Sequence, residues 1–435
     1  MKNTLLTLVA AAALSAVADP TDPQVAISSV TQPEGKYQVT VGYSLDEDAV
    51  ITMDVMTNGV SIGGQNINHV IGDCFKLVKA GTGTFTWYAD KSWPGHRIDE
   101  NIVTIEVKAW AKISPPDFMA IDLMGNFVNY YPSKEFLPGG ITDDLYKTSK
   151  LLMRKIHSKG VSFVMGSPSG EVGRNEHMNN RWSELKSTHS ELQKEVVLDH
   201  DFYIGVYEFT QRQYELSLGS RANSYFSNAD CYAKRPVQGF DFDTLHWENS
   251  ATGGKIRQMK DRYGISSLNL PLEAEWEFAC RAGTTSALYT GKELTSATGE
   301  NENLNAIARY RFNGGNRTDE SGTLLPFDPN WTPEQGGTAE VGSYEPNAFD
   351  LYDMLGNVWE LTRSYWVIDI RDVDVTTWTK LDGIQTICVR GGCWYSQPYD
   401  CRAACRQGWR TDGPSWSEPR EYYGFRLSCA AVAEK

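Results

Sequence analysis

Three phrases in the second half of the chain decide its fold: LPLEAEWEFACRAGT at residues 270–284, PNAFDLYDMLGNVWEL at residues 346–361 and RGGCW at residues 390–394. Each mixes Gly, Trp, Glu and Arg in a way that ordinary core packing does not require. Shorter phrases of the same style accompany them in a fixed order: FVMGS (163–167), DFYIGVYEFTQRQYE (201–215), RPV (235–237), CRAACR (401–406) and GFRL (424–427). The set marks one large domain, whose start we place near residue 144.

The order and wording of these phrases resemble the formylglycine-generating enzyme family, also called sulfatase-modifying factors. The resemblance implies a C-type-lectin-like fold of the α+β class, with little regular secondary structure, small sheets and helices packed beside them. We therefore expect a formylglycine-generating-enzyme-like domain over residues 144–435. Long stretches rich in Gly, Asn, Asp and Pro fit such a loop-rich domain, and Pro271 predicts the start of a short helix over residues 272–280.

The region before this domain predicts strands. Five segments with partial alternation and β-branched or aromatic residues are separated by Gly, Asn, Asp and Pro: 24–29, 37–45, 49–56, 83–88 and 102–111. Several short strands at this spacing predict a small all-β sandwich of immunoglobulin or fibronectin type over residues 19–112. Residues 113–143, where Pro and Gly interrupt any periodicity, are expected to be a linker.

The first 18 residues have the pattern of a signal peptide. Lys2 supplies the positive charge, residues 5–14 are apolar, and Ala16-Val17-Ala18 is a cleavage site of the A-x-A type. The apolar run is shorter than the ~18 residues that a membrane-spanning helix needs. We expect a secreted or periplasmic bacterial protein with no membrane span, whose mature chain starts near Asp19.

Charge and histidine usage exclude two classes of function. The formal net charge of -14 opposes phosphate backbones, and no Lys/Arg cluster interleaves with aromatic residues, so nucleic acid is not an expected partner. The seven histidines are scattered and lack the H-E-x-x-H spacing of a zinc site. A histidine-based metal centre is therefore disfavoured.

The segment from Arg390 to Arg406 decides whether the family's chemistry is present. Active relatives carry two cysteines here, five residues apart, which bind Cu(I) and oxidise a substrate cysteine with O₂. Counted from Gly391-Gly392, those positions fall on Ser396 and Cys401, and an alignment on the downstream Ala-Arg phrase removes both cysteines. Because a serine hydroxyl is a poor Cu(I) ligand, we expect the family's mechanism to fail. A displaced thiol pair drawn from Cys393, Cys401 and Cys405 remains an alternative.

The turn before the second Trp-Glu phrase carries oxygen ligands. Asp353, the carbonyls of Gly356 and Val358, and Glu360 can converge on a hard cation. In the family, the matching stretch binds calcium through those positions, so the resemblance implies a structural Ca²⁺ site. The alternative is a turn that leads into a strand, with Trp359 in the core.

The cysteines favour disulfides. Eight cysteines in an exported chain are more typical of disulfide bridges than of reduced metal sites. The resemblance implies that Cys280 pairs with Cys401. On the helix that carries Cys280, the carboxylates of Glu273 and Glu277 are expected to bind backbone amides or the arginines of other phrases, because buried acids need hydrogen-bond donors.

Two hypotheses about function follow. The first is a binding module without catalysis, whose ligand face for an exported protein or a glycan is formed by Trp409, Trp416, Tyr422 and Tyr423, since such side chains offer rigid contact area. The alternative is an active oxidoreductase that converts a cysteine of an exported partner, such as a sulfatase, to formylglycine with Cu(I) and O₂.

Overall fold

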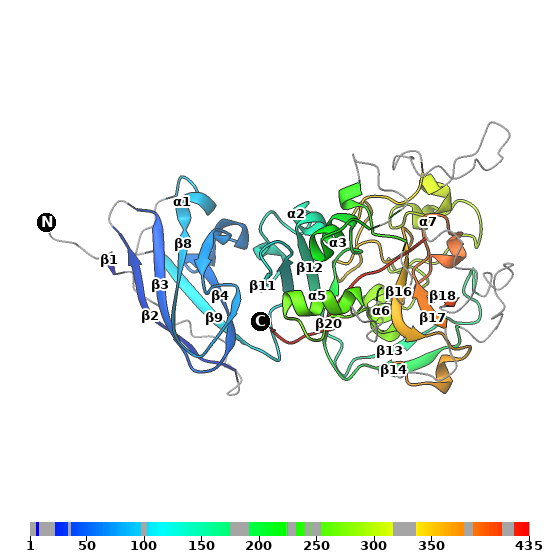
Figure 1. Cartoon of the computed structure of the whole chain (residues 1–435), viewed down its shortest axis with the longest axis horizontal. Coiled ribbons are helices and arrows are strands. Elements are labelled where there is room, and N and C mark those ends of the chain that lie inside the picture. The colour runs from blue at the N-terminus through cyan, green and yellow to red at the C-terminus, as the bar shows by residue number, and fades with distance from the viewer. Residues whose placement is uncertain are drawn as a thin grey trace. The chain divides into compact units, whose positions relative to one another are not determined.

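The computed structural model describes residues 6–7, 22–33, 36–96, 102–174, 191–222, 224, 232–239, 245, 254–315, 336–377, 386–410 and 422–434. The chain divides into two compact units (Figure 1). One comprises Met1–Asp122, Asn126–Tyr146 and Ala431–Lys435, and the other comprises Leu123–Gly125 and Lys147–Ala430. Within the described ranges, the helices are all too short or too polar to cross a membrane.

The first unit contains two antiparallel sheets. One has the order β1-β2-β3-β8-β6; its strands are Leu6–Thr7, Val25–Gln32, Gln38–Leu45, Gly81–Tyr88 and Val70–Gly72. In the other, β4 pairs with β5, β7 and β9; these strands are Ala49–Thr57, Val60–Ser61, Lys76–Val78 and Val103–Ala111. The short helices η1 (Gly64–Ile67) and α1 (Ala89–Ser92) lie between strands.

The alternation of buried and exposed side chains explains why these segments form strands. In β3, Val39, Val41 and Tyr43 are buried while Gln38 and Ser44 are exposed. This is the period-two pattern of a strand with one face against a core. The strands predicted over residues 24–111 are confirmed, whereas the immunoglobulin or fibronectin type of the unit stays a prediction.

Residues 113–143 contain regular structure that we did not predict. Strands β10 (Phe118–Asp122) and β11 (Phe127–Tyr131) form an antiparallel hairpin, followed by the short helix η2 (Lys134–Phe136). The hairpin turn places Asn126 at a φ of 55°, a left-handed conformation that Asn adopts more readily than most residues. The segment that we expected to be a linker is therefore largely ordered, and it groups with the first unit.

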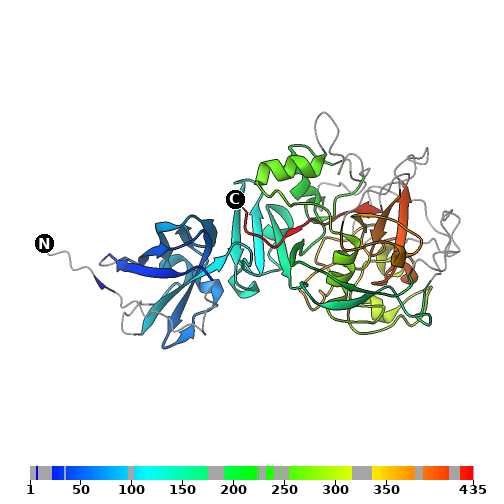
Figure 2. The same ribbon diagram turned by 90° about the horizontal axis from the view of Figure 1, so that it is seen from below.

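The second unit combines small sheets with few helices, as expected for an α+β domain (Figure 2). Strand β15 (Phe202–Gly205) pairs with β12 (Lys150–Ile156) and β20 (Ser428–Ala430), and β13 (Ser162–Met165) pairs with β14 (Lys194–Val197). The third sheet has the order β18-β17-β16-β19; its strands are Arg406–Arg410, Thr386–Arg390, Trp359–Tyr365 and Tyr423–Gly424.

The helices of this unit are short. They are α3 (Gln211–Leu218), α5 (Lys255–Tyr263), α6 (Glu273–Arg281) and α7 (Glu302–Asn305), with single turns η4 (Tyr232–Lys234), η5 (Arg311–Gly315), η6 (Ile370–Asp372) and η7 (Pro398–Asp400); α2 (Leu145–Thr148) precedes β12. Helix α3 begins with a capping box, in which Thr210 and Gln213 exchange side-chain to backbone hydrogen bonds of 3.2 and 3.0 Å.

Helix α6 lies in the core of the second unit. It follows Pro271, as predicted, and the carboxylate of Glu275 accepts a hydrogen bond of 2.8 Å from the backbone N–H of Leu272. All nine of its residues are buried. Trp276, Ala279 and Cys280 belong to a hydrophobic cluster that also contains residues of β13, β14 and β15. A helix buried on every side needs partners for its charged side chains, and these partners define the site.

Candidate functional site

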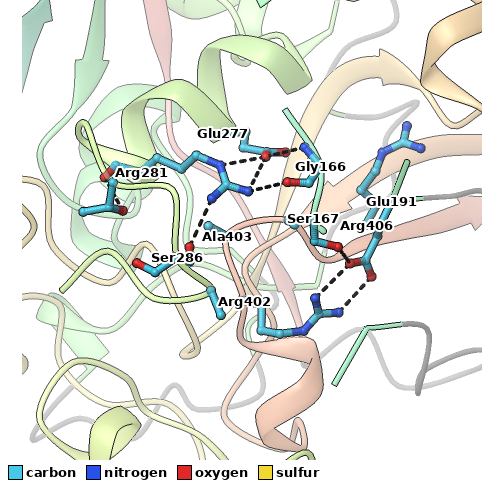
Figure 3. Close-up of polar contacts among 12 residues, drawn as sticks. Gly166, Ser167, Glu191, Glu277, Arg281, Ser286, Arg402, Ala403 and Arg406 are labelled. Atoms are coloured by element: carbon cyan, nitrogen blue, oxygen red, sulfur yellow. Dashed lines mark hydrogen bonds and ion pairs between the residues drawn. The ribbon is translucent and has the colours of Figure 1, made fainter. Parts of the chain in front are cut away.

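Arginines bind both of the predicted carboxylates of α6, and Figure 3 shows the contact of Glu277 with Arg281 of the same helix. Arg406 donates to Glu273 over 2.7 Å, and Arg281 donates to Glu277 over 2.9 Å. Arg390 reaches both glutamates. Burial alone would raise the pKa of Glu273, but the guanidinium of Arg406 outweighs it and the pKa is lowered. The predicted structural role of both glutamates is confirmed.

A second buried pair fixes the beginning of the domain to the CRAACR phrase. Arg402 donates over 2.6 Å to Glu171 and over 2.8 Å to both oxygens of Glu191. Glu191 also accepts a 2.8 Å hydrogen bond from the hydroxyl of Ser167, next to the turn at Gly166 (Figure 3). The one guanidinium faces both carboxylates inside the protein, so these three residues are part of the scaffold and not an acid or base exposed to substrate.

The Gly-Asn turn before β16 is fixed by backbone conformation and by a glutamate. Gly356 has a φ of 81°, and a Cβ atom there would lie 2.3 Å from the carbonyl oxygen of Arg309, so only glycine fits. Glu208 accepts hydrogen bonds of 2.6 Å from the Asn357 side chain and 3.1 Å from the Val358 backbone. The turn leads into β16 with Trp359 buried in the core, which matches the alternative to a cation site.

Of the predicted calcium ligands, Glu360 is already engaged by other side chains. Both oxygens of Glu360 accept from the guanidinium of Arg426, over 2.6 to 2.8 Å, and one also accepts from Trp276 over 2.7 Å. Asp353 is 1% exposed; Oδ2 accepts from the Gly342 backbone over 2.6 Å, and Oδ1 has no hydrogen-bond partner among the described residues. Burial raises the pKa of Asp353 to about 6. The residues present therefore do not fit a Ca²⁺ ion shared by the two carboxylates.

The described residues contain no grouping of three or more His, Cys, Asp or Glu side chains that could hold a metal ion. The calcium site remains a prediction of the sequence, with one unsatisfied oxygen at Asp353 as its remaining donor.

At the position matching the family's first cysteine, Ser396 forms polar contacts of its own. Its Oγ accepts a 3.0 Å hydrogen bond from the backbone N–H of Cys393 and lies 3.4 Å from the Cys393 sulfur. Burial raises the pKa of the neighbouring Asp400 to about 7, and the Ser396 hydroxyl opposes this rise. Ser396 is 6% exposed. The hydroxyl is thus held within the loop between β17 and η7.

The neighbouring thiols are buried. Cys393, Cys401 and Cys405 are 3%, 0% and 0% exposed. Burial raises the pKa of Cys393 to about 12 and that of Cys401 well above its usual value. Because the thiolate is the metal ligand and nucleophile, groups of this kind are poor Cu(I) ligands. The residues present do not fit the family's copper pair.

The predicted disulfide is not formed. Cys280 and Cys401 are both free thiols, and Cys231 lies outside the described residues. Cys280 faces the core from α6, whereas the sulfur of Cys401 packs on the turn at Gly392, 2.7 Å from where a Cβ atom would stand. The bridge between Cys280 and Cys401 is therefore absent, and both sulfurs fill space in the core.

Two of the four residues predicted for the ligand face can be placed. Trp416 and the side chain of Trp409 lie outside the described residues. Tyr422 and Tyr423 are half-buried, and Tyr423 pairs with Trp359 in the sheet. Tyr422 stacks on Tyr395 with ring centroids 5.7 Å apart.

Tyr422 also packs on Trp394, at a centroid distance of 5.5 Å. Arg311 lies over the ring of Tyr395 at 5.0 Å. We call Arg311, Trp394, Tyr395 and Tyr422 the aromatic face. The sequence did not reveal Arg311 or Tyr395 as members; the aromatic pair that follows Gly392 was the available signal.

A model of the sulfatase-modifying factor enzyme 1-like domain matches residues 154–431, more than half of the chain. The buried Arg–Glu scaffold and the ordered phrases are thus those of a known class of domain. The chain belongs to the sulfatase-modifying factor family, as its phrases predicted.

Individual relatives align over shorter stretches. The chain is 39% identical to the formylglycine-generating enzyme of Thermomonospora curvata over 103 residues, which are 23% of this chain and 28% of that protein. It is 33% identical to the formylglycine-generating enzyme of Mus musculus over 99 residues, 23% of each chain. It is 30% identical to the chaperone protein LppX of Paenibacillus barcinonensis over 198 residues, 40% of this chain and 65% of that one. The chain therefore spans less than a third of the two enzymes.

Among solved structures, PvdO from Pseudomonas aeruginosa is similar with a TM-score of 0.45 at 22% identity, covering 64% of this chain and 94% of that one. Treponema denticola variable protein 1 has a TM-score of 0.44 at 19% identity, covering 65% and 95%.

Proposed function

We propose that this protein is an exported, catalytically silent member of its family, which binds a protein or glycan through the aromatic face of a C-type-lectin-like domain. The main support for the proposal is the Ser396 hydroxyl and its contacts. Counted from Gly391-Gly392, a hydroxyl occupies the position of a copper ligand, and it is engaged with Cys393. An alcohol neither binds Cu(I) well nor exchanges with a substrate thiol.

The buried thiols also support the proposal that the protein is catalytically silent. A substrate cysteine must reach the attacking sulfur, and Cys401 has no exposed surface. Its raised pKa also keeps it protonated at neutral pH. A displaced pair formed with Cys393 or Cys405 would meet the same obstacle, because those sulfurs are also buried.

The aromatic face supports the binding role. Tyr395 and Tyr422 are partly exposed, while Trp394 beneath them is buried and anchors the cluster. Stacked rings lose little conformational entropy when a ligand covers them, and Tyr, Trp and Arg dominate the energetics of protein recognition. The first unit is proposed to be a spacer or adhesion module of β-sandwich type.

Mass spectrometry of a Cys-x-Pro-x-Arg peptide tests the proposal. The full chain is incubated with the peptide, Cu(I) and O₂, beside an active formylglycine-generating enzyme as a positive control. We expect the peptide thiol to persist in the presence of this chain. Conversion to the aldehyde would overturn the proposal, and Cys393→Ser, Cys401→Ser and Cys405→Ser would then identify the sulfurs that act.

A further inference from the structure

Arg311 differs in its ion pairing from the buried arginines of the second unit. Arg390, Arg402, Arg406 and Arg426 are each neutralised by a buried glutamate. Arg311 is partly exposed, and among the described residues no carboxylate pairs with its guanidinium. This is notable in a chain with 55 acidic and 41 basic side chains. Within the described part of the chain, the guanidinium is therefore open to an anionic group of a partner.

The backbone that carries Arg311 is firmly held. Its N–H donates over 3.1 Å to the carbonyl of Ser396, which fixes the turn to the loop between β17 and η7. On either side, Asn313 accepts from the Tyr310 backbone over 2.9 Å, and Arg309 donates to the Asn313 carbonyl over 3.0 Å. The backbone of Arg311 is thus held in place, and its guanidinium rests on the ring of Tyr395.

The groups that pack on Tyr395 argue against a sugar ring as the ligand. A sugar ring binds by stacking on an open aromatic face. In this protein both Tyr422 and Arg311 already lie against the ring of Tyr395, at 5.7 and 5.0 Å. Tyr395, Tyr422 and Arg311 are each partly exposed, and Phe312, which follows Arg311 in the chain, is 39% exposed. Bidentate guanidinium donors match a carboxylate, and an apolar neighbour matches an adjacent hydrophobic side chain.

We propose that the aromatic face recognises an acidic segment of a partner protein, with Arg311 binding a carboxylate and Tyr395 and Tyr422 contacting an apolar residue beside it. This inference rests on the proposed binding function and specifies its ligand. Charge complementarity selects the occupant, since Arg311 is a cation without an acidic partner in the described part of a chain that is otherwise strongly acidic.

A displayed library of random linear 12-residue peptides tests the proposal. Peptides are selected on the full chain, and the best is measured against Arg311→Gln, Arg311→Lys and, as a matched control, Arg257→Gln on the exposed side of α5. We expect selected sequences rich in Asp and Glu beside aromatic or aliphatic residues. Arg311→Gln should weaken binding about tenfold, Arg311→Lys less, and Arg257→Gln not at all.

Two further variants separate this inference from the proposed function. If Tyr395→Ala and Tyr422→Ala abolish peptide binding while Arg311→Gln leaves it unchanged, the face binds but acidic recognition is wrong. If no variant alters binding, or no peptide is selected, the aromatic face itself is refuted as a protein-binding site. An acidic oligosaccharide, tested as oligogalacturonate, that binds through Arg311 in place of the peptides would overturn the choice of a protein partner.

Discussion

The arginines of the second unit differ in solvent exposure. We expect the buried ones to contribute most to the free energy of unfolding. Arg402 has no exposed side-chain surface and is paired with Glu171 and Glu191. Arg402→Ala removes the guanidinium that both buried carboxylates contact, so we expect a loss of about 3–5 kcal/mol in the free energy of unfolding. Urea denaturation followed by tryptophan fluorescence measures this. The exposed pair of Lys79 with Asp48 is the control, where Lys79→Ala should change nothing measurable.

His200 makes stability depend on pH. Its Nε2 lies 2.9 Å from Glu275 and its Nδ1 lies 2.6 Å from Asp199; these hydrogen bonds, that of Glu275 first, raise the pKa of His200 to about 9. Since the folded state binds the proton more tightly than the unfolded state, the stabilisation is complete below the unfolded pKa near 6.5 and is lost as pH rises through 9.

The measurement compares melting temperatures of the wild type and His200→Gln. We expect the wild type to melt higher at pH 6 and the gap to close near pH 10. A gap that is constant across this range would mean that His200 acts by packing against Phe202 and not by its charge.

At the scale of elements, the sequence predicted those features that depend on residues close together in the chain. Pro271 and the helical spacing predicted a helix over 272–280, and α6 spans Glu273–Arg281. The hairpin of β10 and β11 was missed because prolines and glycines on both sides suggested a linker, while its order comes from burial of Met119, Ile121 and Val128 against other elements. Burial of this kind depends on tertiary packing, which a single sequence does not display.

The turn at Gly356 offers a matched pair of substitutions. Gly356 and Gly299 have nearly the same φ, 81° and 85°, but a Cβ atom would clash with Arg309 only at Gly356. Gly299→Ala should cost about 1 kcal/mol through backbone strain alone. Gly356→Ala should cost about 2–4 kcal/mol because overpacking adds to the strain. Equal losses in urea denaturation would show that the contact with Arg309 relaxes freely.

The same turn makes a prediction about calcium. Because Arg426 occupies the carboxylate of Glu360, we expect equal melting temperatures in Ca²⁺ and in EDTA. Differential scanning fluorimetry measures both. A rise with Ca²⁺ that disappears in Asp353→Ala would restore the site predicted from the sequence and would require Arg426 to move.

At the scale of the whole molecule, the family was predictable from the sequence, whereas the grouping of the aromatic face was not. Ser396 could be identified by counting from Gly391-Gly392, because the spacing is local. The aromatic face joins Arg311, Tyr395 and Tyr422 from three distant segments, and only Tyr422 was predicted. The disulfide expected from the resemblance was also wrong for this structure, since the core accommodates Cys280 and Cys401 as free thiols.

Copper binding tests the central claim most directly, because it does not depend on the choice of substrate peptide. The reduced full chain is titrated into a coloured Cu(I) chelator under anaerobic conditions, with an active formylglycine-generating enzyme for comparison. With Ser396 in place of a thiolate and Cys401 buried, we predict that the chelator keeps its copper and its absorbance stays constant. Withdrawal of one equivalent of Cu(I) by this chain, lost in Cys401→Ser, would contradict the account and establish a copper site.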